Sequence, residues 1–212
     1  MRRVGWLLLA AAIGCGAGQA TAAVLDASVR SPAGAPVEDA AVVLEPLAGP
    51  APRPRAPARI EQVDREFVPY LSIVQVGTPV QFPNRDRLKH HVYSFSPAKT
   101  FEIKLYVGQP AKPVVFDKPG EVVLGCNIHD WMVAHVLVVD TPWFGKTDAS
   151  GRVRLDGVPA GRYRVRVWHP RQQGAVAAQT VTLGAAPVRA AFGLDVAPAP
   201  PRFKPPADPE GY

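Results

Sequence analysis

The chain has 212 residues, of which 24 are proline and 18 are glycine. Such a composition favours many short strands and turns over helices, and the length suits one large or two small domains. The formal net charge of +6 is dispersed without a basic run, which argues against nucleic-acid binding, and the lack of an 18-residue apolar run argues against a membrane span after processing.

The first residues have the three parts of a secretory signal peptide. These are a positive start at residues 1–3, a short apolar core at 6–13 and small residues for cleavage at 20–22. We therefore expect residues 1–23 to be removed and the mature protein to be periplasmic or otherwise exported. Lipid attachment at Cys15 is an alternative, because the residues before this cysteine resemble the end of a bacterial lipobox.

Cys126 is the only cysteine that remains after cleavage. Removal of Arg2, Arg3 and Cys15 also changes the formal charge from +6 to +4 (6 − 2 = 4), a charge that we attribute to solubility. No disulfide can form within the mature chain, and a lone thiol in an oxidising compartment is open to oxidation unless it is buried or bound to a metal. The compartment therefore favours a metal-binding role for Cys126.

Two predicted strands precede a proline-rich linker. Apolar residues alternate with polar ones at residues 25–30, the chain turns at 32–34, and the apolar pattern resumes at 40–44, which predicts a strand pair within an opening segment, 24–47. Proline recurs through residues 48–59. Because proline lacks an amide donor and fixes φ, this segment is predicted to be an extended linker.

Between residues 60 and 140 the chain alternates strands and turns. We expect strands at 71–76, 79–82, 91–95, 101–106, 114–116, 121–124 and 132–139. So many short strands in so short a span indicate a β-sandwich. Both faces of the last strand are apolar, since Val136 and Val138 share the face of Met132 while Leu137 and Val139 share the other. We therefore expect another part of the chain to cover its outer face.

Residues 141–196 are predicted to supply that cover. After a turn at 147–151, apolar and polar residues alternate with a period of two. The expected strands are 153–155, 163–167, 175–183 and 188–196. The proline-rich tail, 197–212, is expected to be disordered.

The residues most specific for a function are Cys126, His129 and Met132, which lie close together behind an apolar run. A second imidazole is available from His90 or His91 at the head of another predicted strand. Soft sulfur donors with imidazole select copper, and two histidines, one cysteine and a distant axial methionine define a blue-copper electron-transfer site. Because a strand sends adjacent side chains to opposite faces, only one of the two histidines can be the ligand unless the strand bulges.

Residues 60–140 resemble the cupredoxins. The Cys-x2-His-x2-Met motif that begins at Cys126 has the ligand-loop spacing of the amicyanins, and residues 82–90 resemble the strand and loop that deliver the first histidine ligand, six residues after an asparagine. The pattern is also similar to bacterial plastocyanin-like proteins labelled methylamine utilisation proteins. The resemblance implies a domain that binds one type 1 copper, with His91 outside the ligand set. The implied metal ligands are His90, Cys126, His129 and Met132.

Two positions depart from the family pattern. His91 stands where related proteins often carry an asparagine that braces the ligand loop, and Asp130-Trp131 replaces small or proline-containing loop residues. The first departure leaves the choice between His90 and His91 open. The second leaves the identity of the redox partner open.

The flanking parts resemble a different family. Residues 147–170 carry the pattern Thr-Asp-x-x-Gly-x-x-x-Leu-x-x-Val-Pro-Ala-Gly-x-Tyr of the carboxypeptidase regulatory-like (transthyretin-like) β-sandwich, whose opening strands read like residues 28–44. The resemblance implies that the cupredoxin domain is inserted into this sandwich. The expected fold is therefore all-β with two β-sandwich domains, a cupredoxin Greek-key sandwich and a transthyretin/carboxypeptidase regulatory-like sandwich.

The expected function is to carry single electrons between transient protein redox partners. Ile128 and Trp131 flank His129, so the imidazole edge is expected near the surface inside an apolar collar where a partner docks. The sequence has no phosphate-binding loop, nucleophile elbow or His-Glu-x-x-His motif, which indicates a non-enzyme. The carboxylates Asp64 and Glu66 are expected to be solvated.

Three alternatives stay open. The same soft ligands suit a copper carrier or chaperone. A zinc-bound or empty site would use the same residues, although structural zinc rarely takes methionine. The regulatory-like sandwich could also make the protein a metal-free interaction module. His135 and His169 are interpreted as surface or packing residues.

Overall fold

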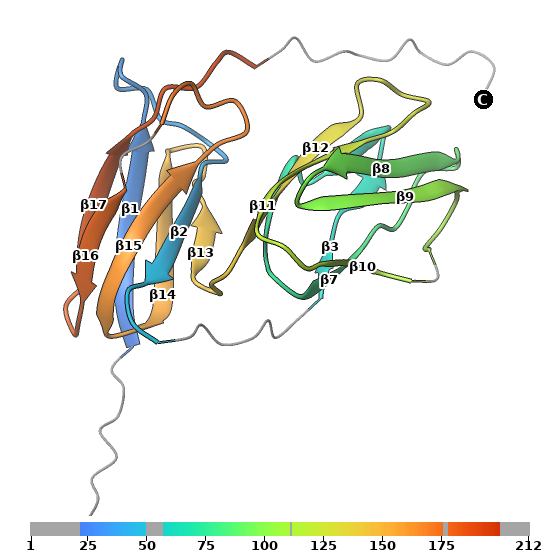
Figure 1. The fold of residues 1–212 in the computed structure, drawn as a ribbon. Coiled ribbons are helices and arrows are strands. Elements are labelled where there is room, and N and C mark those ends of the chain that lie inside the picture. The colour runs from blue at the N-terminus through green and yellow to red at the C-terminus, as the bar shows by residue number, and fades with distance from the viewer. Residues whose placement is uncertain (1–21, 50–56, 111, 176–177, 200–212) are drawn as a thin grey trace, which may run out of the picture.

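The computed structural model describes residues 22–49, 57–110, 112–175 and 178–199. These residues contain seventeen strands and no helix, which confirms the expected all-β class. The strands form two bodies (Figure 1), one built from both ends of the described chain and the other from its middle. No helix that is long and apolar enough to cross a membrane occurs in the described residues.

Several expected segments fall outside the described residues. These are the expected signal peptide apart from Ala22 and Ala23, the middle of the expected linker, and the expected tail beyond residue 199. The last two linker residues are described, and they form the short strand β3, Ala58–Arg59, which pairs with β7 in parallel. The extended linker is thus shorter at this end than the proline pattern predicts, because Ala58 and Arg59 both have amide donors for a ladder.

The first sandwich packs a three-stranded sheet against a four-stranded sheet. The first sheet has the order β14-β1-β17, with β14 at Arg152–Pro159, β1 at Ala22–Arg30 and β17 at Val188–Gly193. The second has the order β13-β2-β15-β16, with β13 at Phe144–Lys146, β2 at Ala41–Pro46, β15 at Gly161–Trp168 and β16 at Gln179–Leu183. Inward side chains of both sheets, among them Leu25, Val42 and Val165, form one core.

The expected pairing of residues 25–30 with 40–44 is wrong, because β1 and β2 belong to opposite sheets. β1 alternates between buried and partly exposed residues, whereas residues 41–44 of β2 are all buried. A strand buried on both faces must be covered on both, and β2 is: Val42 and Leu44 pack in the core of this sandwich, while Ala41 and Val43 pack against residues of the second sandwich. The segment that crosses between the sheets is held by Thr147, whose hydroxyl accepts a hydrogen bond from Ala40 N at 2.8 Å.

The second sandwich contains the predicted copper-binding segments. Its larger sheet has the order β6-β12-β11-β8-β9, with β6 at Leu71–Gln75, β12 at Val133–Val139, β11 at Gly120–Gly125, β8 at His90–Ser96 and β9 at Lys99–Tyr106. Its smaller sheet has the order β10-β7-β3, with β10 at Val114–Phe116 and β7 at Thr78–Gln81. A hairpin of β4, Glu61–Val63, and β5, Glu66–Val68, completes it. Val80, Phe116, Val122 and Val136 fill the core between the sheets.

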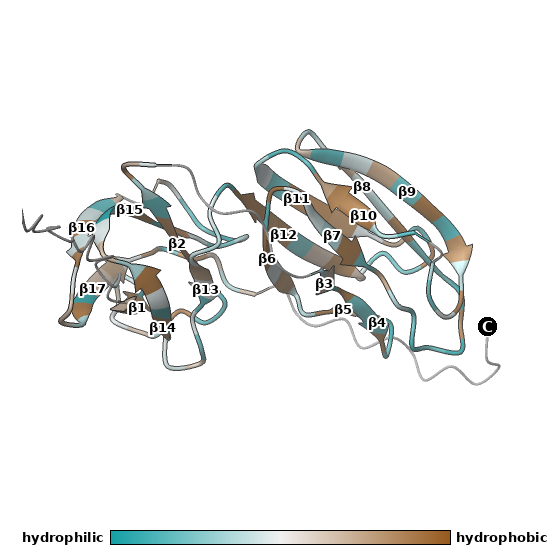
Figure 2. Cartoon of the chain, turned by 90° about the horizontal axis from the view of Figure 1, so that it is seen from below, coloured by the Kyte–Doolittle hydropathy of each residue, from teal (hydrophilic) through white to brown (hydrophobic). Residues whose placement is uncertain are grey.

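The two sandwiches share a smaller apolar cluster. Figure 2 shows them side by side, with β13 of the first next to β6 of the second. The buried members of the cluster are Ala41, Val43, Leu71, Leu137 and Val139. A polar contact lies beside it, where the Trp168 indole N–H donates to the Glu121 carboxylate at 2.5 Å. The second apolar face of β12 is therefore covered, as its sequence pattern predicts. The buried residues that cover it from the first sandwich are Ala41 and Val43 of β2, while the expected cover, 141–196, adds the partly buried Phe144 and Trp168.

Candidate metal centre

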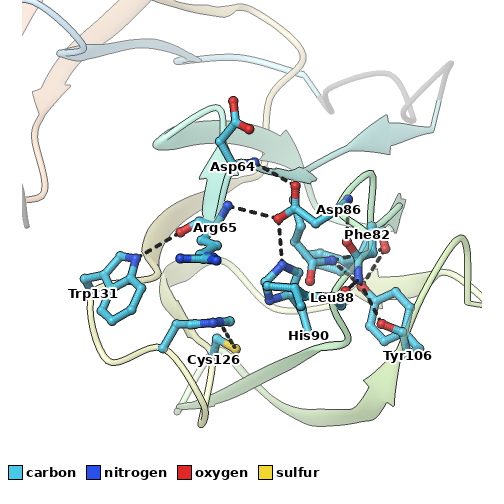
Figure 3. Close-up of polar contacts among 12 residues, drawn as sticks. Asp64, Arg65, Phe82, Asp86, Leu88, His90, Tyr106, Cys126 and Trp131 are labelled. Carbon is cyan, nitrogen blue, oxygen red and sulfur yellow. Dashed lines mark hydrogen bonds and ion pairs between the residues drawn. The ribbon is translucent and has the colours of Figure 1, made fainter. Parts of the chain in front are cut away.

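Three of the four predicted ligands meet at one end of the second sandwich. His90 begins β8, Cys126 directly follows β11, and His129 lies in the loop that leads to β12. One donor atom from each of these side chains lies within 4.8 Å of the others, and the Cys126 Sγ to His129 Nδ1 distance is 3.9 Å. Figure 3 shows the His90 side chain directed toward Cys126.

The spacing of these donors suits one metal ion. Two donors at about 2.0 Å and 2.3 Å from a shared ion, at about 120° to each other, lie about 3.7 Å apart, close to the observed 3.9 Å between Cys126 Sγ and His129 Nδ1. His90 is fully buried, and its Nδ1 atom has no hydrogen-bond partner. Buried polar atoms are almost always paired, so an unpaired nitrogen on a side chain that converges with Cys126 and His129 is available for a ligand. A soft thiolate with imidazoles is a donor set for copper.

The environment of Cys126 favours the thiolate form. Burial alone would raise the pKa of this thiol, but contacts with the His90 imidazole and with the backbone N–H groups of His91, Ile128 and His129 outweigh it and hold the pKa below its usual value. The thiolate is the form that binds metals. The protein therefore prepares this sulfur for a cation by hydrogen bonds as well as by position.

His129 is the more accessible imidazole of the pair. It is partly buried, whereas His90 is fully buried. Burial lowers the pKa of His129, and the nearby His90 and Arg65 lower it further. A metal-binding histidine must be neutral, so this shift favours ligation. The neighbouring Ile128 side chain is 48% exposed, in agreement with the predicted apolar surface beside His129.

Trp131 is less open than a residue of an exposed collar would be. Its ring lies 5.1 Å from the His129 ring, centroid to centroid, and its indole N–H donates to Arg65 O at 3.2 Å. The tip of the β4–β5 hairpin therefore holds this side chain against the ligand loop. Of the two predicted collar residues, only Ile128 is exposed.

Met132, which follows His129 by three residues in the sequence, is buried. Its exposed fraction is 1%, and it belongs to the same apolar core as Cys126. Its backbone N–H donates to His129 O at 2.9 Å, which closes the loop from Cys126 to β12 into a turn. The thioether thus points away from solvent, as an axial ligand or a core side chain would.

His91 lies apart from the group of three donors. Its Nε2 atom is 2.9 Å from a Glu102 carboxylate oxygen on the neighbouring strand β9. The ladder between β8 and β9 does contain an irregularity between His90 and Val92, but the extra residue is on β9, because His90 pairs with Tyr106 and Val92 with Ile103. The alternation of β8 is kept, so the two adjacent histidines face opposite sides.

The loop before His90 is pinned by an asparagine. The Asn84 side-chain amide donates to Leu88 O and to Tyr106 O, both at 2.8 Å. Its carbonyl oxygen accepts from Asp86 N at 2.9 Å. These bonds explain why an asparagine six residues before the histidine supports the site, because they fix the chain that carries both Asp86 and His90.

Sequence reasoning missed Asp86 and the β4–β5 hairpin. Asp86 Oδ2 lies 2.7 Å from His90 Nε2, and the hairpin tip, Asp64 and Arg65, contacts the same carboxylate through its backbone (Figure 3). The signals were a carboxylate four residues before the histidine and an aspartate in a short break between apolar residues. As expected, the side chains of Asp64 and Glu66 are exposed.

Among known proteins, the chain is similar to copper proteins, but the similarity is distant and is found only in structure. No protein-family model and no curated protein matches the chain. A Cu-containing nitrite reductase from Thermus scotoductus SA-01 is 25% identical, with a TM-score of 0.37, over 44% of this chain and 25% of its own. The match thus spans only about a quarter of that enzyme.

Two smaller copper proteins are matched over nearly their whole length. A purple cupredoxin from Nitrosopumilus maritimus is 24% identical, with a TM-score of 0.35, over 38% of this chain and 98% of its own. A mutant of amicyanin in the reduced Cu(I) form is 17% identical, with a TM-score of 0.36, over 46% of this chain and 97% of its own. Likenesses with such low TM-scores assign neither a family nor an activity, and the chemistry of the centre has to be inferred from its own donor atoms.

Proposed function

We propose that the protein is an exported type 1 copper protein that carries single electrons between protein redox partners. The observation that carries this proposal is the convergence of one donor atom each from His90, Cys126 and His129, which lie within 4.8 Å of one another. In addition, the buried Nδ1 atom of His90 has no hydrogen-bond partner. Cys126 and the two imidazoles would hold the ion, with Met132 as a weak axial ligand. Bound there, copper would supply a one-electron couple.

The residues of the chain have distinct roles in this proposal. Cys126 offers a thiolate that is already favoured by hydrogen bonds. His90 offers a rigid buried nitrogen, and the apolar core around Met132 keeps water from a firm place on the ion. The partly exposed His129 beside Ile128 provides the edge through which a transient partner would exchange the electron. None of these roles requires a bond in a substrate to break, in line with a non-enzyme.

We further propose that this site belongs to a cupredoxin domain, 60–140, inserted into a regulatory-like sandwich made of 24–47 and 141–196. In support, the two main cores draw on separate parts of the chain, one on residues 60–138 and the other on residues before and after them. A copper carrier and a metal-free interaction module remain the competing functions. Each of these two functions predicts an absorption spectrum that differs from the spectrum of an electron carrier.

The absorption spectrum of the copper-loaded mature protein tests the proposed function. We expect an intense thiolate-to-copper band and a reversible one-electron couple in the wild type. Cys126→Ser should abolish the band and His90→Asn should abolish or greatly weaken it. His91→Asn is the matched control, because it removes the adjacent imidazole that lies outside the group of three donors, and it should leave the band in place.

Three results would contradict the proposal. A band that survives in Cys126→Ser would refute the ligand assignment. Tight Cu(I) binding without the band would favour a copper carrier. Failure of the wild type to bind one equivalent of copper would favour an interaction module or a zinc site. Metal analysis after zinc loading would separate these two, because only a zinc site would retain zinc.

A further inference from the structure

The carboxylate of Asp86 lies against Nε2 of the buried His90 ring. Asp86 Oδ2 lies 2.7 Å from His90 Nε2, and the exposed fractions of the two side chains are 14% and 0%. An ion pair or charged hydrogen bond at this depth is only weakly screened by solvent. The contact therefore acts on the same imidazole whose other nitrogen, Nδ1, is proposed to bind the metal.

The hairpin tip holds this carboxylate in position. Asp64 N donates to Asp86 Oδ1 at 2.8 Å, and Arg65 N donates to Asp86 Oδ2 at 2.9 Å. Both tip residues have positive φ, 54° and 60°, and both direct their N–H groups at this carboxylate. With His90 as a third partner, both oxygens are occupied and the carboxylate has little freedom to rotate.

The same tip also reaches the loop that carries the other ligands. Arg65 O accepts the hydrogen bond from the Trp131 indole N–H, and the Trp131 ring packs against His129. The hairpin thus joins the His90 segment to the segment of Cys126 and His129. A movement of the tip would change both sides of the site together.

We propose that Asp86 is a positioning residue that fixes His90 with its proton on Nε2 and its lone pair on Nδ1, and that its charge lowers the redox potential of the bound copper. This inference rests on the proposed function. A carboxylate that accepts the second N–H of a ligand histidine fixes the ring and strengthens its donor nitrogen. A fixed negative charge near the ion favours the more positive of its two oxidation states.

Glu102 provides a matched control within the same strand pair. Its carboxylate lies 2.9 Å from Nε2 of His91, so it makes the same kind of contact with the neighbouring histidine. His91 is not one of the three converging donors. Asp86→Asn and Glu102→Gln each remove one negative charge beside one imidazole, but only the first acts on a proposed ligand.

The potential of the copper-loaded protein tests the proposal, with electrons supplied by an electrode through mediators. We expect Asp86→Asn to lower the preference for Cu(II) over Cu(I) by about tenfold, which is a rise of about 59 mV for a one-electron couple. Glu102→Gln should shift the potential by less than a third of that rise. Asp86→Glu, which keeps the charge, should have a potential closer to that of the wild type than Asp86→Asn has. Equal shifts in Asp86→Asn and Glu102→Gln, or no shift in Asp86→Asn, would overturn the proposal.

The metal-free wild type gives a second readout that depends neither on copper nor on the folding of a variant. In ¹⁵N-labelled protein at alkaline pH, we expect the His90 proton on Nε2, with a bare Nδ1. A proton on Nδ1 would overturn the proposal even if copper binds. If the wild type shows no copper band but has the Nε2 proton, the proposed function fails while the positioning role of Asp86 stands.

Discussion

At the scale of single residues, the adjacent histidines of β8 show what makes one imidazole a ligand. Both have a carboxylate oxygen near Nε2, at 2.7 Å for His90 and 2.9 Å for His91. Both also have a buried Nδ1 atom without a hydrogen-bond partner. The difference is the face of the strand, because only His90 is turned toward Cys126 and His129. The chemical type of a residue is therefore not enough, and register decides its role.

Gly125, the residue before Cys126, is predicted to tolerate no side chain. A Cβ atom there would lie 2.8 Å from the Tyr93 ring on the paired strand β8. We expect Gly125→Ala to displace that ring and to lower the free energy of unfolding by about 1–3 kcal/mol, the usual cost of overpacking. Chemical denaturation of the metal-free protein measures this. Gly184→Ala is the control, since a Cβ at Gly184 meets nothing within 4 Å, and an equal loss in both variants would refute the steric explanation.

At the scale of elements, the strands with a clear period of two are predicted well from the sequence. All the strands expected between residues 71 and 139 are found, with boundaries that move by a few residues. The pattern also predicts the local cluster of Cys126 and His129, because both lie in one short loop. What it does not predict is the pairing of β1 and β2, which depends on the sandwich as a whole.

The β4–β5 hairpin could not be predicted for a physical reason. Its tip residues, Asp64 and Arg65, both have positive φ, a conformation that residues other than glycine rarely adopt. Their N–H groups are held by Asp86, which is 22 residues away from Asp64 in the sequence. A turn stabilised by so distant a carboxylate leaves no glycine or asparagine as a local signal, and the role of Asp86 beside His90 is hidden with it.

The contact between this hairpin and the ligand loop is expected to stabilise the loop. Trp131→Phe keeps an aromatic ring beside His129 but removes the indole N–H that donates to Arg65 O. We expect a loss of about 0.5–1.5 kcal/mol, the typical value of one hydrogen bond, together with faster amide hydrogen exchange at residues 127–132. Trp143→Phe, a change in the core of the first sandwich, should leave exchange in that loop unchanged. Equal exchange in wild type and Trp131→Phe would show that the bond does not hold the loop.

At the scale of the whole molecule, β12 connects the site to the junction of the sandwiches. Its inward residues Val136 and Val138 pack in the core that also contains Cys126 and Met132. Its outward residues Leu137 and Val139 pack on the first sandwich. One strand thus contributes to the core beneath the metal centre and to the apolar contact between the two bodies. A rigid support of this kind keeps a site in one geometry, which suits a centre whose proposed task is fast electron exchange.

His169 is expected to make the stability of the molecule depend on pH. It is buried beside the junction, only 2% exposed. Burial, assisted by Arg171, lowers its pKa from 6.5 to about 4. Because the folded pKa lies below the unfolded one, the unfolded chain binds more protons between these values. The contribution of His169 is therefore complete above about pH 6.5 and is lost as the pH falls to about 4.

The comparison of wild type with His169→Asn isolates this contribution. Asparagine can still accept the hydrogen bond that Arg171 N donates to His169 Nδ1 at 3.0 Å, but it does not titrate. We expect the free energy of unfolding of the wild type to fall between pH 6.5 and pH 4 by up to about 3 kcal/mol more than that of the variant, the value that corresponds to such a pKa difference. Urea denaturation of the metal-free proteins across this range measures it. The other histidines are common to both proteins, so parallel curves would show that His169 is not held neutral by burial.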